Sequence, residues 1–125
     1  MTFDDDIGRR AEKIAETFLL NHNLSLRKRN FVTKCGEVDL IMQEGKYCVF
    51  VEVKFRKRAS HGDVLEQVTP QKQQRIIRAA KLYLIQCDQY DTLPCRFDVV
   101  GITPKDHDPS QYHIIWIKDA FSARY

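Results

Sequence analysis

Two short stretches decide how this chain folds: Gly36-Glu37-Val38-Asp39-Leu40-Ile41 and Val49-Phe50-Val51-Glu52-Val53-Lys54. In both, β-branched and other apolar residues recur at every second position, which is typical of β-strands. Strands of this composition are usually buried, yet these two also carry Asp39, Glu52 and Lys54. Because burying a charge is costly unless it is paired or binds a metal, the two stretches predict a charged site within a sheet.

The loop between the two strands contains Gly45-Lys46 and suits a type II′ hairpin turn, which prefers glycine at its first position. This turn predicts one apolar face, formed by the opposed pairs Val38–Val53, Leu40–Val51 and Met42–Val49. On the other face Glu37 lies opposite Lys54, and Asp39 lies opposite Glu52. Glu37 and Lys54 can form an ordinary cross-strand ion pair.

Asp39 and Glu52 have no such simple explanation, because like charges directly opposite each other destabilise a sheet. A divalent cation between them would remove the repulsion. Mg²⁺ or Mn²⁺ is the expected ion, since hard cations take carboxylate oxygens and keep several waters. The alternative is a solvated polar face on which the acids are accidental.

The composition fits one globular domain spanning residues 1–125. The net charge is +3, with 43% hydrophobic and 30% charged residues, which is ordinary for a soluble protein. No apolar run is long enough for a membrane span, and the acidic start of the chain lacks a signal-peptide pattern. The four cysteines form no Cys-x-x-Cys pair. They indicate reduced structural thiols, so we expect a cytoplasmic protein.

Basic residues cluster on both sides of the acidic hairpin, and more of them follow on a later helix. Basic clusters around a carboxylate pair suit a polyanion such as DNA, whose phosphate must reach a metal. The residues expected to contact DNA phosphates are Arg27, Lys28, Arg29, Arg56, Lys57, Arg58 and Lys72. A solvated basic surface is the alternative, and it is the preferred interpretation for the later helix taken by itself.

Two helices are predicted outside the hairpin. An apolar stripe at helical spacing runs from Ile7 to about Leu20, with Asp4 to Asp6 as caps. Glu12 lies at the border of this stripe, where an acid is usually a surface residue but can also point towards the hairpin. Thr69-Pro70 is a clear start for the second helix, which ends near Asp88.

Three further strands are predicted, at Leu24 to Val32, Phe97 to Ile102 and Tyr112 to Lys118, with a loop over residues 103–111. Within the second of these strands, Asp98 is either an accessory acid or the partner of Arg96. The resulting order is α-β-β-β-α-β-β. Because a helix joins the third and fourth strands, they can pair in parallel. We therefore predict an α/β fold with a mixed five-stranded sheet flanked by helices.

This order, together with Asp39 and Glu52-Val53-Lys54, resembles the PD-(D/E)xK nuclease superfamily. More closely, the chain resembles the YraN-like family of small predicted bacterial endonucleases, whose core is similar to that of archaeal Holliday-junction resolvases. The resemblance implies a restriction-endonuclease-like αβββαββ core. It covers nearly the whole chain and includes Gly8, Glu12, Asn30, residues 36–41, residues 50–54, Arg56, Lys72, Ala80, Leu84, residues 96–100 and residues 119–121.

The resemblance also implies a role for each matching site residue. Asp39 and Glu52 would bind Mg²⁺ or Mn²⁺, with the carbonyl of Val53 as a third ligand. Lys54 would position the attacking water or stabilise charge on the phosphate. Glu12 would correspond to the first-helix acid of the resolvases and support the metal site.

Three functions are compatible with the sequence. The first is a metal-dependent DNA endonuclease, selective for branched or junction DNA and acting in repair or recombination. The second is a non-catalytic nucleic-acid-binding module, and the third is a partner subunit on the same fold. Asp39, Glu52 and Lys54 favour the first, because a binding module has no reason to keep opposed acids. Cutting a junction needs two sites, which a homodimer would provide.

Overall fold

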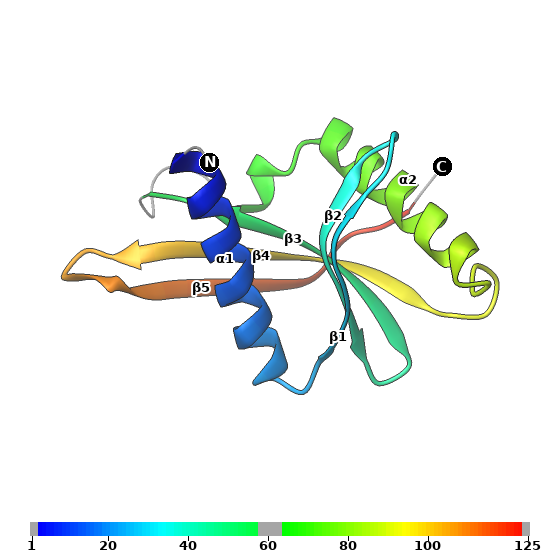
Figure 1. Cartoon of the computed structure of the whole chain (residues 1–125), viewed down its shortest axis with the longest axis horizontal. Helices are drawn as coiled ribbons and strands as arrows, with labels where there is room; N and C mark the ends of the chain where they lie inside the picture. The colour runs from blue at the N-terminus through cyan, green and yellow to red at the C-terminus, as the bar shows by residue number, and fades with distance from the viewer. Residues whose placement is uncertain (1–2, 58–63, 124–125) are drawn as a thin grey trace.

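The computed structural model describes residues 3–57 and 64–123, and their elements follow the predicted order (Figure 1). The elements are α1 (Phe3–Leu20), β1 (Ser25–Val32), β2 (Glu37–Glu44), β3 (Tyr47–Phe55), the 3-10 helix η1 (Val64–Gln67), α2 (Pro70–Gln86), β4 (Cys95–Lys105) and β5 (Asp108–Phe121). The sequence from Ala59 to Val68 predicts a loop or a short helical turn; η1 lies in its described part, and residues 58–63 lie outside the described residues. Neither α1 nor α2 combines the length and the apolar character that a membrane span requires.

The five strands form one mixed sheet in the order β1-β2-β3-β4-β5. β3 and β4 pair in parallel, while the other neighbouring strands pair antiparallel. A parallel pair needs a long crossover connection, and the segment containing η1 and α2 provides it. The predicted α/β fold with a mixed five-stranded sheet is confirmed.

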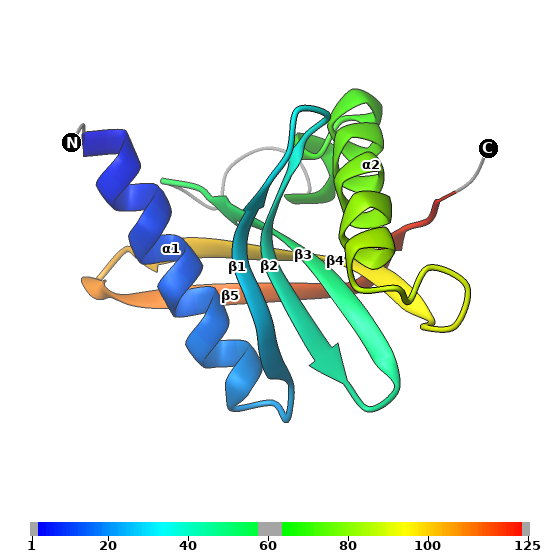
Figure 2. The ribbon, with the colours of Figure 1, turned by 45° about the vertical axis from the view of Figure 1, so that its right-hand side comes forward.

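The two helices cover opposite faces of the sheet (Figure 2). Leu40 and Val51 pack with α1 residues such as Ala15, while Ile41 and Phe50 pack with residues of α2. Because side chains alternate across a strand, the middle of the hairpin is buried on both sides. The predicted apolar face is present at Leu40 and Val51, but the face opposite it is apolar here as well. The charged residues lie beyond this buried part, where residues of both α1 and α2 border them.

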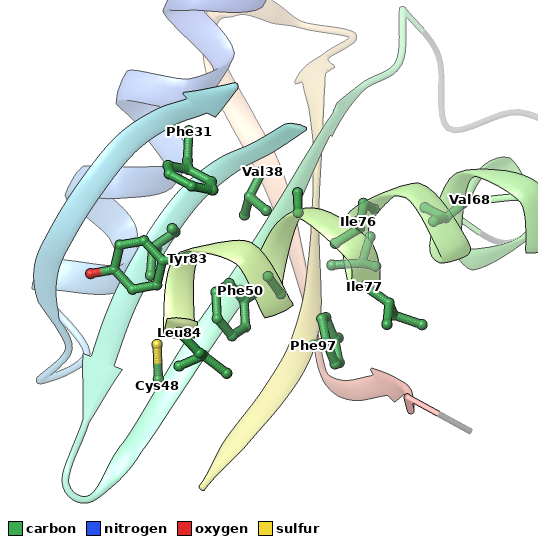
Figure 3. Packing of buried hydrophobic residues seen from close by; sticks show 14 of the residues in the cluster. Phe31, Val38, Cys48, Phe50, Val68, Ile76, Ile77, Tyr83, Leu84 and Phe97 are labelled. Carbon is green, nitrogen blue, oxygen red and sulfur yellow. The ribbon is translucent and has the colours of Figure 1, made fainter. Parts of the chain in front are cut away.

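The core under α2 is built around aromatic rings (Figure 3). Phe50 stacks on Phe97 with ring centroids 5.5 Å apart, and Tyr83 of α2 meets Phe50 edge-on at 6.0 Å. Gly36 lies directly against α2, since a β-carbon there would be 2.3 Å from the carbonyl oxygen of Arg75. Only glycine allows this approach, which holds the first turns of α2 beside the start of β2.

The starts of the two helices were predicted with different success. Thr69 caps α2 as predicted, because its Oγ1 accepts a hydrogen bond from the backbone N–H of Lys72 at 3.2 Å. α1 begins at Phe3, so Asp4 to Asp6 lie within its first turn rather than ahead of it. Acidic residues are favoured at both places, by capping and by the helix dipole, so their presence did not fix the first residue.

The β4–β5 hairpin corrects another prediction. In place of the predicted loop over residues 103–111, the strands are separated only by Asp106-His107. Both prolines that suggested a loop are tolerated because they lie at sheet edges. Pro104 follows Ile102, the last residue of β4 that pairs with β3. Pro109 lies on β5, which is itself an edge strand.

The β2–β3 hairpin has the predicted register over most of its length. Leu40 pairs with Val51, and Met42 pairs with Val49. Gly45 has φ of 56°, as the first position of a type II′ turn requires. The ladder ends at the Leu40–Val51 pair, so the three predicted pairs beyond it, Asp39–Glu52, Val38–Val53 and Glu37–Lys54, are not part of it.

Candidate functional site

The candidate site opens where the β2–β3 ladder ends. The backbone N–H of Val53 donates to Oδ2 of Asp39 at 2.8 Å, whereas in a continued ladder it would pair with the carbonyl of Val38. A side chain thus replaces the backbone acceptor, and the two strands separate. A cavity of about 520 Å³ lies beyond this point, and its wall includes Glu12, Glu37, Asp39, Glu52, Lys72 and Arg75.

Asp39 and Glu52 face this cavity as a pair of adjoining carboxyl groups. Glu52 is only 5% exposed. Burial, the hydrogen bond with Glu52 and the charge of Glu52 together raise the pKa of Asp39 to about 9, while the N–H of Val53 opposes the shift. Near neutral pH the metal-free pair therefore shares a proton instead of carrying two negative charges.

Two further acids, Glu12 and Glu37, contribute negative charge to the same cavity. Glu12 extends from α1, and its burial raises its pKa, although a hydrogen bond with Asn30 lowers it. The charges of Glu37 and Glu52 raise the pKa of Glu12 further. The structure thus brings Glu12 to the carboxylate pair, and it adds Glu37, which the sequence pattern assigned to an ion pair with Lys54.

Two lysines face these carboxylates. The Nζ of Lys72 lies 2.8 Å from Oε2 of Glu52. That oxygen is buried, and no donor among the described residues makes a well-aligned hydrogen bond to it, so the contact with Lys72 is foremost one of charge. Burial and the neighbouring Lys72 lower the pKa of Lys54. Within the described part of the chain no ion pair joins Lys54 to Glu37, because the hairpin ladder ends before reaching them.

The donor atoms of this site suit a hard divalent cation. Asp39 and Glu52 supply carboxylate oxygens, and Oε2 of Glu52 is buried without a hydrogen bond. Among residues 3–57 and 64–123, no three His, Cys, Asp or Glu side chains form a ready-made metal cluster. Mg²⁺ usually needs only one or two protein carboxylates and completes its shell with water and phosphate. The pair therefore fits such an ion, and the Val53 carbonyl stays a predicted ligand.

Arg27 and Arg29, which were expected to contact phosphate, have partners within the protein. Arg27 donates hydrogen bonds to the hydroxyl of Tyr83 at 3.0 Å and to two glutamine side chains. Arg29 makes two hydrogen bonds with Glu16 of α1, at 2.6 and 2.8 Å. Phosphate contact would require these bonds to break. A basic run in the sequence does not reveal such partners, which come from distant elements.

The other basic residues predicted to contact DNA differ in their exposure to solvent. Lys28 on β1 and Lys57 after β3 are exposed, whereas Arg56 is half-buried. Arg58 lies outside the described residues. Lys72 approaches Glu52 instead of extending away from the protein surface.

Gln71 and Arg75 also line the cavity, although no motif in the sequence predicts a site role for either residue. The sequence did indicate that these basic residues act together, because Lys72 and Arg75 are three residues apart on a helix and so share one face. The clear helix start at Thr69 fixed their place in its first turns. What the sequence could not show was that this face points at the carboxylate pair.

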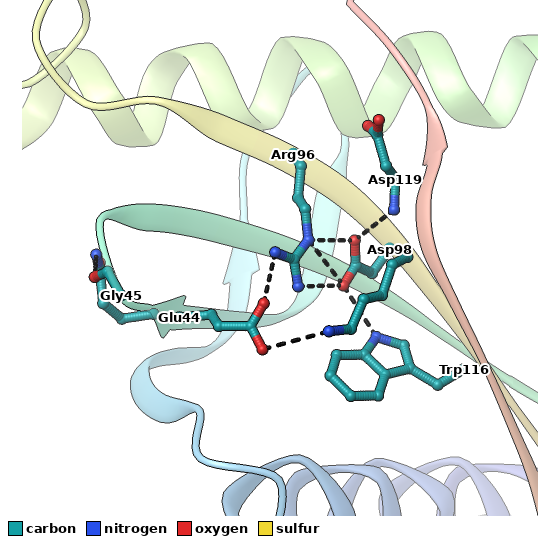
Figure 4. A network of polar contacts seen from close by, with 8 residues as sticks. Glu44, Gly45, Arg96, Asp98, Trp116 and Asp119 are labelled. Carbon is teal, nitrogen blue, oxygen red and sulfur yellow. Dashed lines mark hydrogen bonds and ion pairs between the residues drawn. The ribbon is translucent and has the colours of Figure 1, made fainter.

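Another buried carboxylate, Asp98 of β4, is fully compensated by the protein (Figure 4). It has no exposed surface. It accepts hydrogen bonds from Nε of Arg96 at 3.0 Å, from Nε1 of Trp116 at 2.9 Å and from the backbone N–H of Asp119 at 2.9 Å. The predicted pairing of Asp98 with Arg96 is confirmed. Its oxygens are occupied, which leaves no capacity for the alternative role of accessory acid.

Relatives of this chain match it over almost its full length. The family described as "Uncharacterised protein family UPF0102" matches residues 11–102. A UPF0102 protein of Nitrosococcus oceani is 41% identical over 116 residues, covering 93% of this chain and 91% of the relative. One from Saccharophagus degradans is 43% identical over 122 residues, covering 98% of each. The matched region contains Glu12, Asp39, Glu52, Lys54 and Lys72, and none of these names states an activity.

Proposed function

The chain belongs to the uncharacterised protein family UPF0102, and we propose that it is a metal-dependent DNA endonuclease of the PD-(D/E)xK type. One observation carries the proposal. Asp39 and Glu52 adjoin in a cavity, where burial, the hydrogen bond with Glu52 and the charge of Glu52 hold the pKa of Asp39 at about 9. A bound divalent cation would remove the cost of holding two carboxyl groups together in a buried place. A purely structural site has no need for such a pair.

Asp39 and Glu52 would hold Mg²⁺ or Mn²⁺ through their carboxylate oxygens, and Glu12 would keep the surroundings of the ion negative. When bound, such a cation lowers the pKa of a coordinated water and stabilises charge on a phosphate. Lys54 is positioned by β3 beside the pair. Its pKa is lowered by burial and by Lys72, which suits a group that orients the attacking water or neutralises charge developing on the phosphate.

The surroundings of the cavity support a nucleic-acid substrate. Arg75 lines the wall on α2, and Lys57 is exposed directly after β3. Such groups would contact the phosphates that flank the scissile one, independently of sequence. We propose structured or branched DNA as the substrate class, in a repair or recombination setting, with a homodimer supplying the two sites that a junction requires.

Cleavage of a panel of duplex, single-stranded, flap, fork and four-way-junction DNA, with Mn²⁺ and with chelator, tests the proposal. Wild type should cleave at least one substrate only with metal, and Glu52→Gln should not. Glu37→Gln is the matched control, because it removes an equal charge from the same cavity without touching the pair, and it should keep most activity. Equal cleavage by wild type and Glu52→Gln, or no cleavage of any substrate, would refute the proposed activity.

A non-catalytic nucleic-acid-binding module is the second candidate, and one observation favours it. Lys72 already supplies a positive charge to Glu52, at 2.8 Å. If this ion pair persists when DNA is bound, the site has no place for a metal. The module would then bind DNA with equal affinity in chelator and in Mn²⁺, and none of the panel would be cut.

A further inference from the structure

Resting on the proposed function, we infer that the ammonium group of Lys72 occupies the place of the divalent cation in the metal-free protein and leaves it when the cation binds. Lys72 would thus be a positioning residue with two places: on Glu52 without metal, and on the substrate phosphate with metal. Loading of the site with metal and binding of DNA would be coupled through this one side chain.

The first support is the contact itself. Nζ of Lys72 lies 2.8 Å from Oε2 of Glu52, whose side chain is only 6% exposed. This oxygen is one of the proposed metal ligands, and it accepts no hydrogen bond from any described residue. The ammonium therefore supplies a positive charge at this oxygen, where the proposed metal ion would lie. A cation and the ammonium group cannot both lie against this oxygen.

The second support is the position of Lys54. Lys54 extends from β3 beside the same carboxylates, and it interacts with Lys72 as well as with Glu52. Two lysines are thus held together by the acids of the cavity. A divalent cation would neutralise those acids and remove the reason for keeping both lysines there. Of the two lysines, Lys72 is the one whose Nζ lies against Oε2 of Glu52, so Lys72 is the one that a cation at this oxygen would displace.

The third support is that the Lys72 side chain can move without its helix. The backbone of α2 is fixed at this end, because the N–H of Lys72 is capped by Thr69 at 3.2 Å and Gly36 packs against the carbonyl of Arg75. The Lys72 side chain itself is 43% exposed. Exchange with a metal therefore needs only a rotation of its flexible stem.

The released side chain would join an existing basic residue. Arg75 lies one turn further along α2 and lines the same cavity. A lysine in the first turn of a helix is disfavoured by the helix dipole unless an anion is close. Glu52 is that anion in the metal-free protein, and a DNA phosphate would be the anion after metal has bound. The helix dipole thus favours either state in which Lys72 is paired with an anion over a state in which the Lys72 ammonium has no anion nearby.

Calorimetric titration of Mn²⁺ into wild type, Lys72→Met, Lys72→Arg and Arg75→Met, without DNA, tests the inference. Lys72→Met keeps the length of the side chain but removes the competing charge, so Mn²⁺ should bind roughly tenfold more tightly, about 1.4 kcal/mol. Lys72→Arg should bind like wild type. Arg75→Met is the matched control, since it removes one charge from the same wall without a contact to Glu52, and it should change Mn²⁺ affinity little.

DNA binding supplies a second readout. With Ca²⁺ present to prevent cutting, Lys72→Met should bind DNA more weakly than wild type, whereas in chelator the two should bind alike. Unchanged or weaker Mn²⁺ binding by Lys72→Met would overturn the inference, even if wild type cleaves DNA. If wild type binds no Mn²⁺ but Lys72→Met does, the inference holds and the proposed activity of the wild type fails. If neither binds Mn²⁺, both are overturned.

Discussion

Two buried carboxyl sites lie side by side in this sheet and are compensated in opposite ways. Asp98 on β4 pairs in register with Val51, the residue before Glu52. Asp98 receives hydrogen bonds from a guanidinium group, an indole and a backbone N–H (Figure 4). Glu52 instead adjoins a second acid, and one of its oxygens is buried without a hydrogen bond. Burial of a carboxylate is thus no sign of function by itself; incomplete compensation is.

The comparison also separates the faces of the sheet. Asp98 lies next to Val51 on the α1 side, where Trp116 packs, whereas Glu52 projects to the α2 side with Lys72. Neighbouring residues of one strand point to opposite faces. Replacing these acids should therefore have different consequences. Substitution of Asp98 should lower stability, and substitution of Asp39 or Glu52 should lower activity.

The largest effect is expected at the compensated site. Asp98→Asn removes a fully buried charge opposite Arg96, so the free energy of unfolding should fall by about 3 kcal/mol. Urea unfolding of the two proteins measures it. Glu16→Gln, which breaks the ion pair with the exposed Arg29, is the control and should lose far less. A loss at Asp98 as small as that of the control would contradict the comparison.

The next effect is expected at the Asp39–Glu52 pair and concerns rate. Lys54→Met should cut DNA about 100-fold more slowly at saturating metal, as removal of one transition-state donor does. In chelator it should bind DNA with the affinity of wild type, and its melting temperature should equal that of wild type. Single-turnover kinetics and melting curves measure these quantities. Cleavage within twofold of wild type would leave Lys54 without a catalytic role.

A smaller effect should depend on pH. Folding raises the pKa of Asp39 from 3.8 to about 9. The stability that the bound proton contributes is therefore fully present below about pH 4 and is lost as the pH rises towards 9. Asp39→Asn cannot titrate, so in chelator it should exceed wild type by at least about 1 kcal/mol near pH 8, with the difference shrinking at lower pH.

Urea unfolding from pH 5 to pH 9 checks the Asp39→Asn prediction. Added Mn²⁺ should stabilise wild type by mass action but leave Asp39→Asn unchanged. A pH-independent difference between the two proteins would mean that the carboxyl groups are not coupled as described. The side-chain amide oxygen that Asp39→Asn introduces can still accept the N–H of Val53, so loss of that bond does not complicate the result.

The smallest effect concerns DNA affinity. Lys57 is exposed two residues beyond the end of β3, so Lys57→Ala should reduce the slope of log Kd against log salt by about 1. Arg27 is tied to Tyr83, so Arg27→Ala should lower stability without changing that slope. Binding isotherms at several salt concentrations test both variants. The reverse pattern would restore Arg27 as a phosphate contact.

The sequence predicted the sheet, the hairpin register and the start of α2 because each depends on local signals. Alternation placed Leu40 opposite Val51, and Thr69 and Pro70 marked a helix start. The same alternation could not show that the carboxylate of Asp39 would replace a backbone acceptor and end the ladder. The contact between Lys72 and Glu52 was also hidden, because it joins two elements whose relative position depends on packing at Gly36.

The central claim is that the carboxyl pair of Asp39 and Glu52 binds a divalent cation. It is tested most directly by titrating Mn²⁺ into the protein while following the electron paramagnetic resonance signal of free Mn²⁺. Wild type should remove a single Mn²⁺ per chain from the free pool, and Glu52→Gln should remove none. Equal binding by the two proteins would contradict the claim.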